Sequence, residues 1–379
     1  MFEQLNLREW PFRPSADEHY AAIWAGRTRT KIQLTRLLSK MKIIPKSNLH
    51  IFWANFGMGK THTLFHLKYR AQKNDGQIIP IYTVMPKSSS GFIELYREIA
   101  QAFLSIEMRD YLGRQLVELG QTCRGSSVAL HPMFSKSPGV VKALLAIRSG
   151  DIEATTNAMQ WLIGQPGLSS RVLSAIGVSY RIKTPEDAIN ALSTLINLAT
   201  YTGKKQKQLL LMIDEYQRIG ELKSKVMNQV NSCLHTIFNQ HPVGLQLMLT
   251  FSFGKKENVE FLLSPELKSR ADLQPITLDL LSHEEGVIFL EELLDHFHIQ
   301  KDTNNLLFPF TDDAVHFMLE TIEKKKTLTP RRIMSYANHV LSEFMIDSDG
   351  SSEVISRSYI ENILTSGELG DLDIDLDSN

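Results

Sequence analysis

The chain contains few cysteines, little net charge and no long hydrophobic run. Its two cysteines, Cys123 and Cys233, do not have the spacing of a metal-ligand motif. A disulfide framework and a zinc site are therefore not expected, and the cytoplasm is the predicted location. No apolar run reaches the ~18–20 residues that span a bilayer, and the amino terminus lacks a signal-peptide pattern, so no membrane partner is expected.

The formal net charge is −1, which gives no general electrostatic attraction to nucleic acid. Local basic runs are present at Lys204–Lys207, at Lys255-Lys256 and at Lys324–Lys326. Each run is more typical of a solvated loop than of a phosphate contact, although both interpretations stay open. The length of 379 residues and the 43% hydrophobic content are enough for two or three packed units.

The most informative segment present is Phe52–Thr63, with the sequence FWANFGMGKTHT. An apolar, strand-like run leads into it, and an amphipathic helical pattern follows. Gly57 and Gly59 allow a tight turn that directs N–H groups at phosphate oxygens. Lys60 would contact the β- and γ-phosphates, and the Thr61 hydroxyl would bind Mg²⁺. The segment therefore predicts a nucleotide-phosphate site.

A second motif follows the continuous apolar run Leu209–Ile213. Such a run is typical of a strand that is buried on both faces of a parallel sheet. Asp214 and Glu215 come directly after it, where α/β sheets bind ligands. We expect Asp214 to hold Mg²⁺ through water and Glu215 to orient and deprotonate the attacking water. Without the first motif, a strand that ends in a solvated acidic turn would be an equal alternative.

Further strands and helices are expected around these motifs. The pattern predicts strands at 77–85 and 245–253, a β-like segment at 275–280, and helices at 30–40 and 92–104. Helices are also expected to begin near Thr311 and Thr329. Strands that alternate with helices indicate an α/β fold with a parallel sheet.

Four regions are predicted along the chain. They are an amino-terminal segment at 1–48, a core at 49–280 with a helical insertion at about 105–185, a helical domain at 281–365, and an acidic tail at 366–379. The insertion either contacts a partner or substrate, or only enlarges the core. For the tail, a disordered acidic segment is favoured over a docking peptide that adds an edge strand to a basic partner.

Together these segments resemble the AAA+ ATPases of the origin-recognition-like and STAND-related branches. Gly57–His62 (GMGKTH) resembles their Walker A motif, which makes Met58 and His62 nucleotide-contact candidates. Ile213–Glu215 resembles their Walker B motif. The resemblance covers about 20–365 and implies a P-loop AAA+ core with a carboxyl-terminal helical lid.

The same resemblance suggests roles outside the two Walker motifs. Trp24–Arg27 (WAGR) resembles the box before the phosphate loop, although Thr28 replaces the usual acid. Trp24 and Arg27 are candidates for adenine contact, and a helix cap with a core tryptophan explains them equally well. Thr250 or Ser252, at the polar end of the strand at 245–253, could report the γ-phosphate state, and Ser252 resembles the sensor-one residue. Arg331 lies in a P-R pair like that of a sensor-two lid. Arg270 resembles an arginine finger, which would act on a neighbouring subunit and so implies a homo-oligomer.

A narrower resemblance is to ATP-binding proteins of bacterial phage-defence systems, including BREX-type ATPases. It rests on the G-K-T-H of the phosphate loop, on Trp161–Gly164 (WLIG) and on Pro330–Ile333 (PRRI). The amino-terminal segment LREWPFRPSADEHYAAIWAGR also resembles the opening of transposon target-site ATPases. These resemblances imply ATP and Mg²⁺ as cofactors, ATP hydrolysis, and a protein partner from the same system or double-stranded DNA.

Two functions of different classes are therefore predicted. The first is an ATP-dependent oligomeric switch that acts on DNA in a bacterial defence or mobile-element system. The second is a signalling or scaffold ATPase that assembles with ATP and recruits a separate effector, which the near-neutral net charge favours. A module that binds nucleotide without hydrolysis is a third alternative, indicated by Ala54 and Thr28, and the Asp214-Glu215 pair argues against it.

Overall fold

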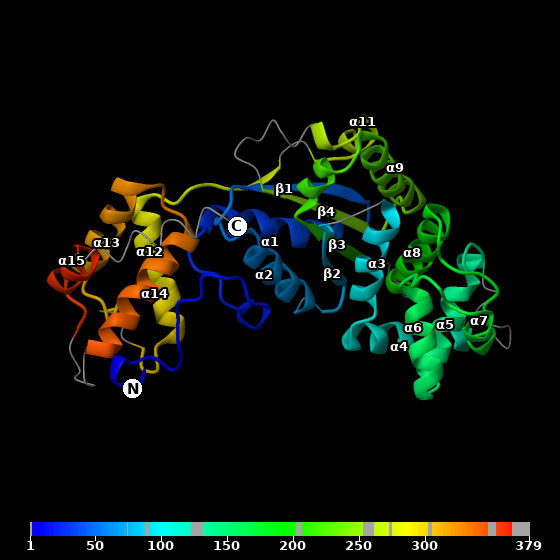
Figure 1. Ribbon diagram of the computed structural model, residues 1–379, viewed down its shortest axis with the longest axis horizontal. Coiled ribbons are helices and arrows are strands. Elements are labelled where there is room, and N and C mark those ends of the chain that lie inside the picture. Colours follow the sequence, from blue (N-terminus) through cyan, green and yellow to red (C-terminus); the bar gives the residue numbers. More distant parts are fainter. Residues whose placement is uncertain are drawn as a thin grey trace. The chain divides into compact units, whose positions relative to one another are not determined.

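The computed structural model describes residues 2–73, 75–87, 91–122, 132–201, 207–252, 261–272, 275–301, 305–347 and 354–365 (Figure 1). Cys123, two of the basic runs (204–206 and 255–256) and the acidic tail lie outside these ranges. The chain forms two compact units. The first comprises Met1–Gln33, Ala54–Tyr69 and Thr277–Asn379, and the second Leu34–Trp53 and Arg70–Ile276. The boundaries expected at 48, 280 and 365 remain a prediction.

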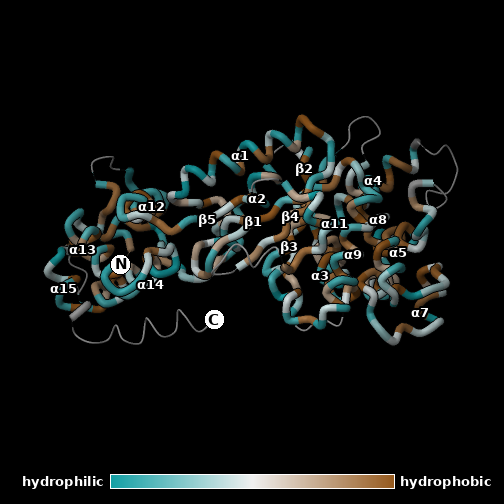
Figure 2. Tube along the Cα trace, turned by 90° about the horizontal axis from the view of Figure 1, so that it is seen from above, coloured by the Kyte–Doolittle hydropathy of each residue, from teal (hydrophilic) through white to brown (hydrophobic). Residues whose placement is uncertain are grey.

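A five-stranded parallel sheet has the order β2-β3-β4-β1-β5. The strands are β1 (Asn48–Ala54), β2 (Ile78–Val84), β3 (Gln208–Asp214), β4 (Leu245–Ser252) and β5 (Ile276–Leu278). Every residue of β3 and β4 is buried, as expected for central strands that are covered on both faces. In Figure 2 these two strands are largely hydrophobic. The predicted α/β fold with a parallel sheet is confirmed.

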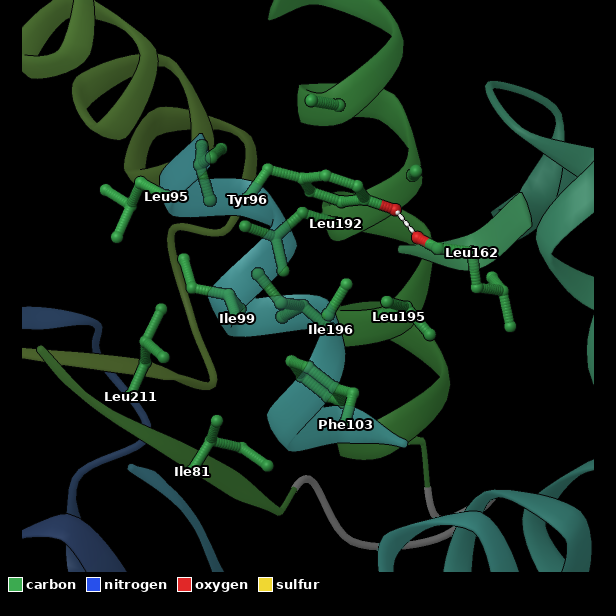
Figure 3. Close-up of a cluster of buried hydrophobic side chains, with 14 of the residues drawn as sticks. Ile81, Leu95, Tyr96, Ile99, Phe103, Leu162, Leu192, Leu195, Ile196 and Leu211 are labelled. Atoms are coloured by element: carbon green, nitrogen blue, oxygen red, sulfur yellow. Dashed lines mark hydrogen bonds between the residues drawn. The ribbon is translucent and has the colours of Figure 1, made fainter. Parts of the chain in front are cut away.

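Two helices of the second unit pack on this sheet. They are α3 (Phe92–Phe103), which contacts β2, and α8 (Pro185–Thr200), which contacts β3. Figure 3 shows Ile81 of β2, Leu211 of β3 and Phe103 of α3 in one group of hydrophobic side chains. All three side chains are buried in one hydrophobic cluster. Helix α9 (Ser224–Gln240) packs against α8 and α3, and apolar side chains of α9 and of the central strands belong to the same hydrophobic cluster.

The region at about 105–185 lies between β2 and β3 and is largely helical, and its role as an insertion stays a prediction. It contains α4 (Ile106–Thr122), η4 (Pro132–Phe134), α5 (Pro138–Arg148), α6 (Ile152–Leu162) and α7 (Ser170–Ala175). Trp161 is fully buried there, and its indole N–H donates to the Tyr180 carbonyl at 2.6 Å. A Cβ on Gly139 of α5 would lie 2.8 Å from the Trp161 ring, so this contact requires glycine. The Trp161–Gly164 motif thus forms part of the insertion core.

The first unit contains the carboxyl-terminal helical domain. Its helices are α12 (His283–Phe297), α13 (Asp312–Lys325), α14 (Pro330–Asp347) and α15 (Arg357–Thr365). The predicted helix starts near Thr311 and Thr329 are confirmed. Leu7 and Phe12 of the amino-terminal segment, which carries η1 (Phe2–Leu5) and η2 (Glu18–Tyr20), belong to the hydrophobic cluster of this domain. The Phe12 ring meets Phe310 edge-on, with centroids 6.0 Å apart.

Three further elements complete the fold. Helices α1 (Thr28–Ile43) and α2 (Lys60–Gln72) flank β1 in the sequence, and α11 (Pro265–Lys268) is a short helix that packs against α9. A 3-10 turn, η5 (Tyr216–Glu221), follows β3. None of the helices in the described ranges is both long and apolar enough to cross a bilayer.

Candidate functional site

The glycine-rich loop joins β1 to α2. Strand β1 ends at Ala54, which does not have a positive φ, and α2 begins at Lys60. Gly57 and Gly59 have φ values of +75° and +82°, a region that side chains with a Cβ rarely adopt. The turn therefore requires glycine at both positions and places the amino terminus of a 13-residue helix after it. Such a terminus favours an anion through its N–H groups and its dipole.

The first turn of α2 is closely packed. Lys60 is buried, with 6% of its surface exposed, and Met58 is buried in the loop before it. The Thr63 N–H and the Thr63 hydroxyl both donate to the Gly59 carbonyl at 2.9 Å. These two bonds connect the first turn of α2 to the last glycine of the loop.

Arg27 binds the backbone of the glycine-rich loop. It has a φ of +61°, and its guanidinium donates to the Met58 carbonyl at 3.2 Å and to the Asp279 carbonyl. Burial lowers the pKa of Arg27 to about 10. These contacts give Arg27 a role in holding the loop backbone, and its contact with adenine stays a prediction.

Two histidines of α2 connect that helix to the segment around Trp24. His62 lies with its Nε2 2.6 Å from the Ile23 carbonyl, and burial lowers its pKa. His66 lies with its Nδ1 2.8 Å from the Ala21 carbonyl, and its ring faces Trp24 with centroids 4.8 Å apart. Trp24 therefore packs on α2, and its contact with adenine also stays a prediction.

Arg331 in the first turn of α14 lies next to the same loop. Its backbone N–H donates to the Gly57 carbonyl at 3.2 Å. A Cβ on Gly57 would lie 3.4 Å from both the Arg331 Cβ and the Thr329 Oγ1. Within the first unit, the structure thus brings the residue of the lid-like P-R motif to the phosphate-loop motif.

In the second unit, Asp214 ends β3 and is almost fully buried, with 1% of its surface exposed. Its Oδ1 accepts hydrogen bonds from the Thr250 hydroxyl and from the Glu215 N–H at 2.8 Å. Its Oδ2 accepts one from the Tyr82 hydroxyl at 3.3 Å. A buried carboxylate needs such donors, because burial without them is costly. Tyr82 was not expected to contact the motif, and no sequence pattern links it to Asp214.

Glu215 follows with φ 55° and ψ 35°, a left-handed conformation that is uncommon for a residue with a side chain. Its Oε1 accepts from the Ser252 hydroxyl at 3.2 Å. Its Oε2 accepts from the Gln217 amide at 2.6 Å and lies 3.9 Å from Arg218. The structure therefore brings the expected pair Glu215 and Ser252 together. The contacts of Gln217 and Arg218 with Glu215 were not predicted. The sequence indicates them only in that these residues follow Glu215 by two and three positions.

Two other predictions concern an arginine after α11 and a pair of lysines at the end of α13. Arg270 is exposed after α11 and donates to the Asn239 side chain at 3.1 Å within the second unit. Lys324 and Lys325 are exposed at the end of α13 in the first unit. The roles of these residues toward a neighbouring subunit or DNA stay predictions.

Comparison with known proteins agrees with the sequence interpretation. The family model described as "BREX system ATP-binding protein BrxC/D" matches residues 132–259, about a third of the chain, which includes β3 and β4. The chain is thus similar to these proteins from η4 through β4 and for a few residues beyond it. No curated protein matches the sequence.

Solved structures are similar only at the level of the fold. The Aeropyrum pernix ORC1 protein in complex with DNA is 14% identical, with a TM-score of 0.46, and 90% of this chain covers 66% of that one. The ORC2 protein of the same organism, in ADPNP-ADP complexes, is 11% identical with a TM-score of 0.48, with 98% and 74% covered. The Thermotoga maritima RuvB Holliday junction branch migration motor is 13% identical with a TM-score of 0.44, with 97% and 75% covered.

Proposed function

We propose that this chain binds ATP with Mg²⁺ and hydrolyses it to ADP and phosphate. The observation that supports this most directly is the left-handed glycine turn that ends on Lys60 and Thr61 at a helix amino terminus. Asp214 and Glu215 add two acidic residues at the end of β3, and each accepts a hydrogen bond from a hydroxyl of β4. β3 is a central strand of the sheet and pairs in parallel with β2 and β4, and α/β sheets bind ligands at the carboxyl ends of such strands.

The residues present suit a magnesium nucleotide. Among the described residues, no group of three or more His, Cys, Asp and Glu side chains could hold a metal ion by itself. Mg²⁺ in nucleotide sites uses one or two protein oxygens together with phosphate oxygens and water, and it neutralises charge on the phosphates. The Thr61 hydroxyl and the Asp214 carboxylate would supply the protein oxygens.

The chain's own groups would then perform the hydrolytic step. The Lys60 ammonium and the N–H groups of the loop would bind the β- and γ-phosphates. Glu215 would orient the attacking water and accept its proton, while Ser252 holds that carboxylate. Arg270 from a neighbouring subunit would stabilise charge on the transferred phosphoryl group, so hydrolysis would require a homo-oligomer.

Two substitutions test this proposal. Lys60→Ala is expected to abolish ATP binding in a calorimetric titration, because the triphosphate loses its charge partner. Lys225→Ala, which changes an exposed lysine in the first turn of α9, is the matched control. Tight ATP binding by Lys60→Ala would refute the assignment.

The hydrolytic role has its own test. Glu215→Gln is expected to bind ATP but not to turn it over, whereas Glu221→Gln, at an exposed position, should leave turnover unchanged. Normal turnover by Glu215→Gln would show that a group other than Glu215 is the general base. Mixed assemblies of Glu215→Gln and Arg270→Ala should regain activity if the arginine acts between subunits.

At the biological level, we propose an oligomeric switch that acts on DNA in the cytoplasm of a bacterium, in phage defence. The similarity of 132–259 to BREX-system ATP-binding proteins supports this role. The expected result is ATP turnover stimulated by double-stranded DNA, with a steep salt dependence of DNA binding. Turnover and assembly that do not respond to DNA would contradict it.

A cavity in the insertion favours a second candidate, recruitment of a protein effector. The cavity has a volume of about 630 Å³ and is lined by residues of α4 and α5. Val117, in its lining, and Leu145, next to it on α5, are 38% and 43% exposed. If an effector binds there, Val117→Asp with Leu145→Asp should abolish co-purification of that protein and leave ATP turnover unchanged. Retained co-purification would exclude this surface.

A further inference from the structure

We propose that Gln217 is a positioning residue that fixes the Glu215 carboxylate against the end of β4 and thereby sets the rate of hydrolysis. The inference rests on the proposed function, since it requires Glu215 to act as general base. Neither the Walker motifs nor the comparisons assign any role to Gln217. The contacts that carry the inference all lie within the second unit.

Gln217 uses both ends of its side-chain amide. Its Nε2 donates to the Glu215 Oε2 at 2.6 Å, and its Oε1 accepts from the Ser252 N–H at 3.0 Å. A flipped amide would place oxygen against carboxylate oxygen and an NH₂ group against an N–H donor. The two partners therefore define one orientation of the amide, which is half-buried in the first turn of η5.

These contacts form a ring of hydrogen bonds among Gln217, Ser252 and Glu215. Gln217 binds the backbone of Ser252, and the Ser252 hydroxyl donates to the other oxygen of Glu215 at 3.2 Å. Each carboxylate oxygen of Glu215 thus has a donor that fixes its direction. A carboxylate oxygen can accept more than one hydrogen bond, so this arrangement orients the group and leaves it able to accept a proton.

The surrounding turn makes such support necessary. Glu215 lies at φ 55° and ψ 35°, directly before the 3-10 turn η5, and 23% of its side chain is exposed. A partly exposed carboxylate on a turn has several accessible side-chain conformations. Arg218 is directed toward the Met85 carbonyl, to which it donates at 2.7 Å, and lies 3.9 Å from Glu215. The shorter contact from Gln217 is therefore the stronger constraint on Oε2.

The hydrogen bond between the Ser252 N–H and Gln217 also links the end of β4 to the general base. Ser252 is the last residue of β4 and is buried. A displacement of its N–H would move the Gln217 amide, and with it the Glu215 carboxylate. Displacing a catalytic group by about 1 Å can reduce a rate by about 100-fold. The state of the β4 end would in this way control hydrolysis without a change in nucleotide affinity.

The test is Gln217→Leu, which removes both hydrogen bonds at similar volume. We expect kcat for ATP hydrolysis to fall about 10- to 100-fold, while the Kd for ATP changes less than about 2-fold. Gln101→Leu, at an exposed position of α3, is the matched control and should leave both unchanged. In the Glu215→Gln background, where the base is absent, Gln217→Leu should not reduce single-turnover hydrolysis further.

The outcomes separate this inference from the proposed function. If the wild-type chain hydrolyses ATP, Glu215→Gln is inactive, and Gln217→Leu retains normal kcat, only the positioning role is overturned. An equal loss from Gln217→Leu with and without Glu215 would also overturn it. If Glu215→Gln turns over normally, the proposed base fails and this inference fails with it. Should Gln217→Leu not fold, Gln217→Glu brings a second carboxylate to Glu215 and is expected to reduce kcat by at least as much.

Discussion

Replacing Thr250 by valine should destabilise the protein without creating a cavity. Thr250 is fully buried, and its hydroxyl donates to the Asp214 carboxylate. Valine has nearly the same shape, so the substitution removes a hydrogen-bond donor and little else. A hydrogen bond to a charged group contributes about 1.5–3 kcal/mol, and the buried carboxylate oxygen would lose one of its donors. We therefore expect the free energy of unfolding to fall by about 2 kcal/mol.

The measurement is urea unfolding at neutral pH without nucleotide, followed by far-UV circular dichroism. Thr236→Val is the matched control, because the half-buried Thr236 donates its hydroxyl to the carbonyl of Ser232, one turn earlier on α9 and exposed. The control should change the unfolding free energy by less than about 0.5 kcal/mol. The comparison requires an unchanged slope against urea, so that the midpoint reports stability alone.

The result that refutes this reasoning is equally specific. If Thr250→Val and Thr236→Val have the same unfolding free energy, Asp214 does not depend on the Thr250 hydroxyl. Its remaining donors, the Glu215 N–H and the Tyr82 hydroxyl, would then be sufficient for the buried carboxylate. A loss of ATP affinity in Thr250→Val with no loss of stability would instead indicate that the contact orients Asp214 toward Mg²⁺.

Two further predictions concern a buried histidine and a loop glycine. Burial lowers the pKa of His241 to about 4, so below about pH 6.5 the unfolded chain binds a proton that the folded chain does not. The unfolding free energy should therefore fall by about 2 kcal/mol from pH 7 to pH 5, and less in His241→Gln, as measured by urea unfolding at both pH values. Gly57→Ala should cost about 1–2 kcal/mol of stability because of its positive φ, and should weaken ATP binding in calorimetry. Gly76→Ala is the control, because Gly76 has a φ of +64° and open space around it. This variant should lose stability and keep its ATP affinity. Equal ATP affinities in Gly57→Ala and Gly76→Ala would contradict the role of Gly57.

Much of the fold could be predicted from local sequence. Central strands such as Leu209–Ile213 are continuous apolar runs, and their bounds in the structure agree with expectation to within one or two residues. The glycine turn before Lys60 could be predicted too, because its geometry depends on residues adjacent in sequence. Local hydrophobic patterns and turn residues carry this information directly.

The partners of the site residues could not be predicted in the same way. Tyr82 reaches Asp214 because β2 and β3 pair in one particular register, which no local pattern specifies. Arg27 contacts the Met58 carbonyl through packing of segments far apart in sequence. The packing of the amino-terminal segment into the helical domain, with Phe12 against Phe310, likewise depends on long-range contacts.

The bond between the Gly57 carbonyl and the Arg331 N–H joins two main chains, and this has a consequence for how the position can vary. Any residue except proline at 331 can donate this bond, so the mechanical connection does not depend on the arginine. Arg331→Ala would remove the positive charge and keep the connection. Arg331→Pro would remove both, and proline is tolerated in the first turn of a helix. An effect on the site that appears in both variants is due to loss of the Arg331 charge. An effect that appears only in Arg331→Pro is due to loss of the backbone hydrogen bond between the helical domain and the loop.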